Sequence, residues 1–476
     1  MKCLSGNFLT VSLLLFSITS FCQGYQVTLQ TPDYTGGLAY LTYYYGKNAN
    51  IQDSALVDKK GVAVFKSDKK LAPGVYSIVL PGKTKLADFL VDKEQIITVK
   101  IDTTDLVNKT IVSGSKENEL FQQYQKFTSM KGKQLDAEQR AYKISRTQGD
   151  SLLHEKKYNL LSVELTQYRE NIIKIHPQSM LASLLQSMAQ TELPKARPVT
   201  KKDSLINYEY YRKHYWDGVS FMDDRIIRTP FFLPKLETYF REVLPPVPDS
   251  IIKESDYILL LARSNPEMYK FLLNWLTDEY IYPKYMGQDA VFVHLYEKYH
   301  SKGVSVWLNE KQQNTISNRA YMLMANQIGE KASDLEMIDT SGRPYNLYDV
   351  NADYTVVCFW DPTCSHCRAE VPELDTLYQT KWKQEGVKMY GVLTENEKDK
   401  WLQFIKKYNL AGWIHVYQTE EMKKAGRDLN KPGYHQLYDV TETPTLYLLD
   451  KEKRIIAKKL SWKQLDDVLQ AKLKIH

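Results

Sequence analysis

Two cysteines separated by two residues lie where a buried strand is expected to give way to a helix. Residues 356–374 read VVCFWDPTCSHCRAEVPEL, and Cys364 and Cys367 flank Ser365 and His366. The apolar run before the pair is typical of a strand covered on both faces, and the residues after Cys364 follow a helical pattern. This order of strand, Cys-x-x-Cys and helix predicts an α/β segment with its first thiol at a helix N-terminus.

The α/β pattern extends over the rest of the chain from residue 326. Further β-prone runs cover residues 387–393, 413–418, 443–450 and 454–460. Helical patterns separate the first of these runs, and a last helix is expected at 463–473. Alternating strands and helices that end in a hairpin predict a mixed sheet.

Two other patterns precede this segment. Residues 25–115 hold short β-prone runs separated by Gly, Pro, Asp and Asn, which predicts a small all-β, sandwich-like module. Residues 116–325 repeat apolar side chains at helical spacing, with proline-containing breaks, and predict a helical domain. We therefore expect a multidomain protein whose C-terminal α/β domain covers residues 326–476.

The first 24 residues are typical of a signal peptide. Lys2 precedes the apolar run FLTVSLLLFSITSF, and small residues then flank a cleavage position near Ser20–Gly24. No later segment has about 18 uninterrupted apolar residues, so we expect an exported protein that is soluble or lipid-tethered. Cys22 raises the alternative of a lipid anchor, but bulky Phe21 before it favours ordinary cleavage.

Cleavage would leave three of the five cysteines: Cys358, Cys364 and Cys367. A structural zinc site needs four ligands, and the sequence has neither a second Cys-x-x-Cys nor a suitably spaced histidine pair. We expect no metal and no other cofactor. The net charge of +6 is spread over the chain without a long basic run, which argues against a nucleic-acid partner.

The position of the pair favours redox chemistry. The thiolate is the attacking species in thiol–disulfide exchange, and a helix N-terminus favours negative charge on Cys364. Cys367 lies one turn further along the same helix face. It is placed to attack a mixed disulfide at Cys364 and release the substrate.

The segment FWDPTCSHCRAEVPEL resembles the active-site strand and helix of the thioredoxin superfamily, in particular its TlpA-like or ResA-like periplasmic branch. Residues 328–350 are similar to the lead-in of that branch, and TETPTLYLLDKEKRI is similar to its second landmark, a proline before a strand. The resemblance covers residues 326–476. It implies an exported thiol–disulfide oxidoreductase with a thioredoxin fold.

The resemblance also implies roles for individual residues. Cys364 corresponds to the nucleophile and Cys367 to the resolving thiol. Pro444 corresponds to a cis-proline beside the pair, which would leave the Thr443 backbone open to an extended substrate. Glu370 matches an acidic residue that could handle the proton of the resolving thiol, although a solvated helix charge explains it equally well.

Three other residues bear on substrate contact, on core packing or on the direction of the redox reaction. Trp360 matches the usual aromatic residue, and we consider it for core packing and for substrate contact. Cys358 replaces the buried aspartate of cytosolic thioredoxins and fits an inert core cysteine. His366 between the cysteines resembles the oxidase and isomerase branches, whereas the wider frame resembles reductases.

The implied partners are disulfide-bonded proteins and a membrane electron donor or thiol partner. The sequence predicts no oligomeric state. A disulfide oxidase or isomerase stays open as an alternative, as does a binding protein with a redox-sensitive thioredoxin module. A peroxidase does not fit, because Pro362 and Thr363 directly precede Cys364 instead of lying further upstream.

Overall fold

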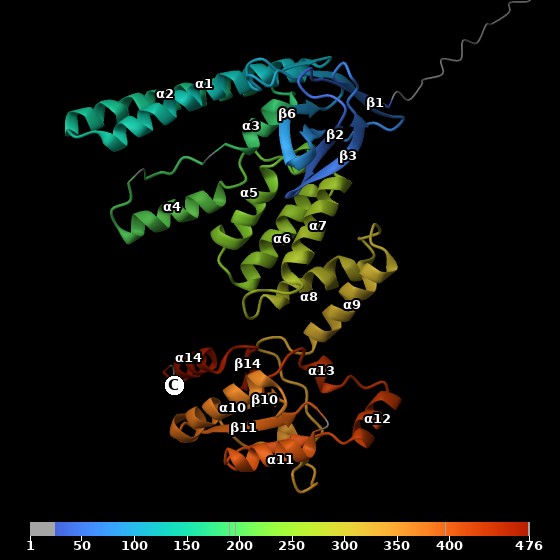
Figure 1. The fold of residues 1–476 in the computed structure, drawn as a ribbon. Helices are drawn as coiled ribbons and strands as arrows, with labels where there is room; N and C mark the ends of the chain where they lie inside the picture. The colour runs from blue at the N-terminus through green and yellow to red at the C-terminus, as the bar shows by residue number, and fades with distance from the viewer. Residues whose placement is uncertain (1–23, 190, 196, 396, 475–476) are drawn as a thin grey trace, which may run out of the picture. The chain divides into compact units, whose positions relative to one another are not determined.

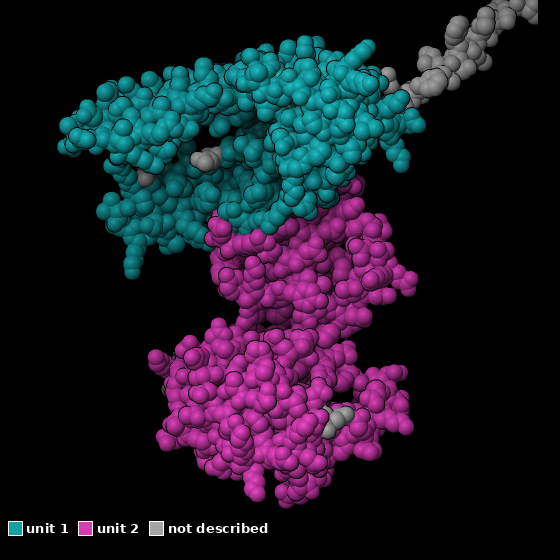
Figure 2. All heavy atoms as spheres, in the orientation of Figure 1, with its two compact units in different colours: residues 1–239 teal, residues 240–476 magenta. Residues whose placement is uncertain are grey.

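The computed structural model describes residues 24–189, 191–195, 197–395 and 397–474. These residues form two compact units, within 1–239 and within 240–476, which Figure 2 colours separately. The helical domain expected at 116–325 is therefore divided between the two units. The expected signal peptide lies outside the described residues except for Gly24. No helix of the described ranges has the length and apolarity needed to cross a membrane.

The first unit begins with a β-sandwich (Figure 1). Its strands are β1 (Tyr25–Gln30), β2 (Leu38–Tyr45), β3 (Asn48–Leu56), β4 (Val62–Ser67), β5 (Gly74–Leu80), β6 (Thr84–Val91), β7 (Ile96–Lys100) and β8 (Ile111–Ser113). They form two four-stranded sheets in the orders β4-β1-β7-β8 and β3-β2-β5-β6. Val27 and Phe65 of one sheet share a fully buried core with Leu41 and Phe89 of the other. The predicted all-β module is confirmed.

Helices complete the first unit. They are α1 (Lys116–Ile144), α2 (Gln148–Ile175), α3 (Met180–Ser187), α4 (Lys201–Lys213) and α5 (Phe232–Thr238). The long helices α1 and α2 lie side by side (Figure 1). Asn118 joins α1 to the sandwich, because its buried side chain exchanges two 2.7 Å hydrogen bonds with the backbone of Leu90 in β6.

The second unit starts with four helices. They are α6 (Pro248–Ala262), α7 (Pro266–Tyr280), α8 (Asp289–Lys298) and α9 (Glu310–Met324). Ile258, Leu272, Phe292 and Ala320, one from each helix, are fully buried, as the helical spacing of apolar residues predicts.

A six-stranded sheet forms the rest of the second unit. Its strands are β9 (Ile338–Asp339), β10 (Tyr354–Trp360), β11 (Val387–Leu393), β12 (Ile414–Tyr417), β13 (Thr445–Leu449) and β14 (Ile455–Lys458). Its helices are α10 (Ser365–Leu377), α11 (Lys398–Lys407), α12 (Glu420–Asp428), α13 (Tyr434–Leu437) and α14 (Trp462–Leu473). The order is β14-β13-β10-β11-β12-β9, with β10, β11 and β12 parallel and the other pairs antiparallel. This is the mixed sheet with a terminal hairpin that the sequence predicts.

Strand β10 lies in the middle of the sheet and separates two hydrophobic cores. Its alternate residues Val356, Cys358 and Trp360 face a core shared with α10, α11 and α14. Val357 and Phe359 face the opposite core, which α13 and residues 332–350 cover. Both faces are buried, which explains why residues 356–360 are apolar at every position instead of alternating.

Both outer strands of this sheet have backbone partners on their free sides. Gly329 donates to the Ile455 carbonyl at 2.8 Å, and Ile455 donates to the Glu330 carbonyl at 2.9 Å, along the outer side of β14. On the outer side of β9, Asp339 donates to the Arg343 carbonyl at 2.8 Å. The segment that leads into β10 therefore pairs with one residue of each outer strand, Ile455 and Asp339.

Candidate active site

The site lies where β10 ends and α10 begins. Cys364 is the N-cap residue of α10, as the strand-to-helix prediction requires. In the antiparallel register Phe359 pairs with Thr445 of β13, which places Thr443 and Pro444 beside the end of β10. The Thr443–Pro444 peptide bond is cis, as the resemblance implies. The structure therefore brings Cys364 together with a loop about 80 residues later in the chain.

The surroundings of Cys364 favour its thiolate. Burial opposes ionisation, but the amide N–H groups of Cys367 and His366 and the Thr443 side chain outweigh it, so the pKa of Cys364 lies below its ordinary value. The Cys364 thiol also lies 3.3 Å from the Thr443 carbonyl oxygen, to which it donates when protonated. Cys364 is half-buried and therefore accessible to another molecule.

Cys367 differs from Cys364 both in its burial and in the direction of its pKa shift. Its side chain is fully buried, and burial raises the pKa of the Cys367 thiol to about 12. The Asp361 amide N–H lies 3.5 Å from the Cys367 sulfur and partly opposes this shift. An accessible thiol with a lowered pKa beside a buried thiol with a raised pKa fits a nucleophile and a resolving cysteine.

Asp361 holds the loop between β10 and α10. Its carboxylate accepts hydrogen bonds from the Thr363 amide at 2.8 Å and from the Thr363 hydroxyl at 2.6 Å. Neither this role nor the hydrogen bonds of the Thr443 side chain to the two sulfurs was predicted. The Asp-Pro-Thr sequence carries a usable signal for the first, because aspartate that bonds the backbone two residues on is a common turn former.

Two predicted residues lie on α10 beside the pair. Glu370 is half-buried, and its charge, after burial and the Cys367 sulfur, contributes to holding the pKa of Cys358 well above its ordinary value. The carboxylate is thus near the buried thiols, and its role as their proton acceptor stays a prediction. The His366 side chain is exposed, and it is the His366 backbone amide that reaches Cys364.

Trp360 lies in the core of the domain. Its side chain is fully buried against Phe404 of α11, with ring centroids 5.2 Å apart. The predicted core packing is confirmed, and complete burial gives the predicted substrate contact no exposed surface on Trp360 in this structure. Cys358 is fully buried in the same core, as expected of an inert cysteine.

No ligand set for a metal is found near the pair. In the part of the chain that the structure describes, His, Cys, Asp and Glu side chains form no group of three able to hold a metal ion. Cys358, Cys364 and Cys367 are free thiols.

Two parts of the chain match known families. Residues 328–458 match the AhpC/TSA family, and residues 25–121 match a domain of unknown function, DUF4369. The chain is similar to the thiol-disulfide oxidoreductase ResA of Bacillus thuringiensis subsp. konkukian, with 25% identity over 148 residues, 31% of this chain and 78% of the relative. ResA of Bacillus subtilis is 23% identical over 128 residues, which are 27% of this chain and 64% of that protein.

Parts of the chain are also similar to solved structures. A domain of a "possible thiol-disulfide isomerase" from Cytophaga hutchinsonii is 36% identical, with 31% of this chain and 97% of that chain covered and a TM-score of 0.27. A thioredoxin-like protein from Bacteroides caccae is 23% identical, with 60% of this chain and 98% of that chain covered and a TM-score of 0.46.

Proposed function

Since residues 328–458 form a thioredoxin-like domain of the AhpC/TSA family, we propose that the protein is a thiol–disulfide oxidoreductase that reduces or exchanges disulfides of other exported proteins through Cys364 and Cys367. The observation that carries the proposal is the contrast between the two thiols. Cys364 is accessible with a lowered pKa, and Cys367 is fully buried with a pKa of about 12.

The first step is attack on the substrate. The Cys364 thiolate attacks one sulfur of a substrate disulfide, and a mixed disulfide forms between Cys364 and that sulfur. The other substrate sulfur leaves as a thiolate and takes a proton from solvent. The Thr443 backbone lies beside Cys364, and we assign it the role of pairing with the extended segment that carries the substrate disulfide.

The second step releases the substrate. Cys367 loses its proton and attacks the Cys364 sulfur, and the second substrate sulfur leaves and is protonated. Glu370, one turn further along α10, is the candidate acceptor for the Cys367 proton, because a raised thiol pKa makes deprotonation the unfavourable part of this step. The substrate gains two electrons and two protons, and the protein is left with a Cys364–Cys367 disulfide.

A dithiol donor must then return the protein to its reduced form. We assign this role to a membrane electron donor or a thiol partner. We also propose that residues 1–24 direct export of the protein to the periplasm, where it would meet this partner. The exposed His366 between the cysteines supports the opposite direction, oxidation or isomerisation of substrate disulfides.

Turnover of insulin with dithiothreitol tests the proposal. We expect the full chain without its first 24 residues to accelerate insulin reduction. Cys364→Ser should abolish the acceleration. Cys367→Ser should accumulate a mixed disulfide with insulin, which is seen as a separate band on non-reducing gels. Cys358→Ala is the matched control, since Cys358 is a buried cysteine outside the pair and its loss should leave the rate unchanged.

The same preparation distinguishes the possible directions. A reduction potential of the pair near about −270 mV against glutathione would mark a reductase, and a value towards about −120 mV would mark an oxidase or isomerase. If Cys364→Ser reduces insulin as fast as the unmodified chain, or if no Cys364–Cys367 disulfide forms, the oxidoreductase proposal is wrong and the binding-protein alternative takes its place.

A further inference from the structure

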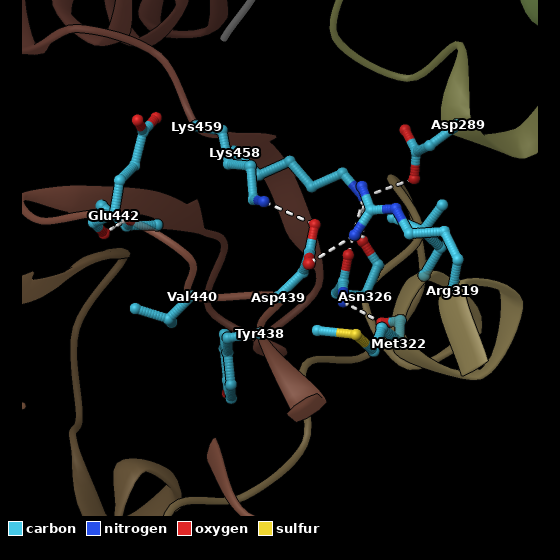
Figure 3. Close-up of polar contacts among 12 residues, drawn as sticks. Asp289, Arg319, Met322, Asn326, Tyr438, Asp439, Val440, Glu442, Lys458 and Lys459 are labelled. Carbon is cyan, nitrogen blue, oxygen red and sulfur yellow. Dashed lines mark hydrogen bonds and ion pairs between the residues drawn. The ribbon is translucent and has the colours of Figure 1, made fainter. Parts of the chain in front are cut away.

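A buried carboxylate lies just before the loop that reaches the thiol pair. Asp439 is in the link between α13 and β13, and only 1% of its side chain is exposed. Its two carboxylate oxygens accept from Arg319 Nη1 and from Lys459 Nζ, each at 2.5 Å. Figure 3 shows Asp439 between these two cations. The start of the loop is therefore fixed by a side chain of helix α9, which is outside the thioredoxin-like domain.

Arg319 is itself held by three contacts. Its Nε donates to the Ile281 carbonyl at 3.1 Å, and its guanidinium lies 4.9 Å from the centre of the Tyr282 ring, just after α7. With Asp439 as the third contact, each end of the planar guanidinium has a partner. A lysine at this position could keep the charge but not this set of directions.

Neighbouring contacts hold the same stretch of backbone. The Asn326 side chain donates to the Leu437 carbonyl at 3.1 Å, and the Tyr447 hydroxyl donates to the Tyr438 carbonyl at 2.5 Å. Asp439 itself has a φ of 47°, a left-handed conformation that costs a non-glycine residue energy and is kept where the surroundings fix it.

The anchored stretch leads directly to the site. Four residues after Asp439, the Thr443 carbonyl lies 3.3 Å from the Cys364 sulfur, and the Thr443 side chain hydrogen-bonds both sulfurs of the pair. At its other end the loop is tied by the Thr445 hydroxyl, which donates to the Glu442 carbonyl at 2.6 Å. The position of Thr443 thus depends on one anchor in β13 and one at Asp439.

Net stability is a poor explanation for the Asp439 pairs. Taking charges out of water costs several kcal/mol per ion, and an apolar replacement of similar volume is often neutral or stabilising. What a buried ion pair with fixed hydrogen-bond directions does supply is a defined geometry. Here the ion pairs of Asp439 fix the position of the backbone that leads to Thr443.

We propose that Arg319 and Asp439 are positioning residues of the redox site, through which helix α9 holds the loop that places Thr443 against Cys364. The inference deepens the proposed function, since it assigns two residues to the same thiol pair. It also gives part of the helical region a role in the chemistry of the C-terminal domain. Neither residue contacts the reacting sulfurs, so both act through Thr443.

The test is the pH profile of Cys364 alkylation by iodoacetamide in the full chain, with the Cys364 peptide followed by mass spectrometry. We expect Arg319→Met and Asp439→Asn to move the midpoint to higher pH and to slow alkylation below the original midpoint about threefold or more, because Thr443 then leaves the sulfur. Arg319→Lys should restore part of the rate. Far-UV circular dichroism and thermal unfolding show whether each variant is folded.

Asp289→Asn is the matched control. Asp289 makes a second buried ion pair between the same two parts of the unit, with Lys458 at 2.6 Å (Figure 3), and its carboxylate also accepts a hydrogen bond from the Gln327 side chain. We expect Asp289→Asn to lower thermal stability and to leave the Cys364 profile unchanged. An unchanged profile in folded Arg319→Met, or an equal shift in Asp289→Asn, overturns the inference.

The readout needs no disulfide substrate. A chain that fails to reduce insulin but shows the shifted profile in Arg319→Met would refute the proposed function and leave this inference intact. A chain that reduces insulin, but in which Arg319→Met leaves the pH profile of Cys364 alkylation unchanged, would support the proposed function and refute this inference.

Discussion

At pH 8, iodoacetamide should modify Cys364 tens of times faster than Cys367. The pKa of Cys364 lies below 9.0, so roughly a tenth or more of it is thiolate at this pH. The pKa of Cys367 is about 12, so its thiolate fraction is about one in ten thousand. The two fractions differ on the order of a thousandfold in favour of Cys364.

Intrinsic reactivity reduces this advantage. Thiolate nucleophilicity rises with pKa with a slope of about 0.4–0.5, so a gap of about three pKa units makes the Cys367 thiolate about 15–30 times more reactive. The net preference for Cys364 is then about 30–60-fold. A still lower pKa of Cys364 changes this little, because its larger thiolate fraction and its weaker nucleophilicity nearly cancel. Burial of Cys367 can only increase the preference.

Pulse labelling measures this preference. Reduced protein is treated with iodoacetamide for increasing times, quenched, digested and quantified at both cysteines, between pH 5 and pH 10. We expect the rate at Cys364 to rise with pH to a midpoint below 9.0 and Cys358 to stay unlabelled. Equal rates at Cys364 and Cys367, or a Cys364 midpoint at or above 9.0, would refute the assignment of nucleophile and resolving thiol.

Two further predictions concern stability. Asn118→Ala should lower the free energy of unfolding of the first unit by about 2–4 kcal/mol, measured by urea denaturation. The substitution removes two buried hydrogen bonds and leaves the Leu90 amide and carbonyl unpaired. A decrease below about 0.5 kcal/mol would contradict this prediction. Burial lowers the pKa of His415 from 6.5 to about 4, so the unfolded state takes a proton first and stability falls as pH drops from 6.5 to 4, by about 3 kcal/mol in all. His415→Asn should flatten that part of the stability–pH curve, whereas His176→Asn, at an exposed histidine, should not; equal slopes in both variants refute it.

The sequence predicts the elements that are strongly patterned. Residues 356–360 of strand β10 are all apolar because both faces of the strand are buried, and that pattern, with the helix after Cys364, locates the thiol pair. The sequence pattern does not predict helix α12, because Met422 and Ala425 are the apolar side chains among its nine residues and neither is buried, which is too little for a periodic pattern to be recognised.

The local sequence pattern does not predict contacts between residues that are far apart in the chain. Arg319 and Asp439 are 120 positions apart, and nothing local to either residue indicates the other. The division of the helical region between two units also depends on which partners its helices find. The Thr443 hydroxyl falls in the same class, because a side-chain direction at a loop is set by the strands that hold the loop.

The covered edges of the C-terminal sheet have a consequence for recognition. A sheet with a bare outer strand can take up an extended polypeptide along that strand, which recruits many sequences and also promotes aggregation. Here the backbone of residues 329–330 occupies the outer side of β14, and the Asp339–Arg343 turn occupies that of β9. These contacts shorten the free stretch of each outer strand. In the proposed reaction, the main chain of a client would pair with the short loop at Thr443, so that selection would act on the few residues around its disulfide.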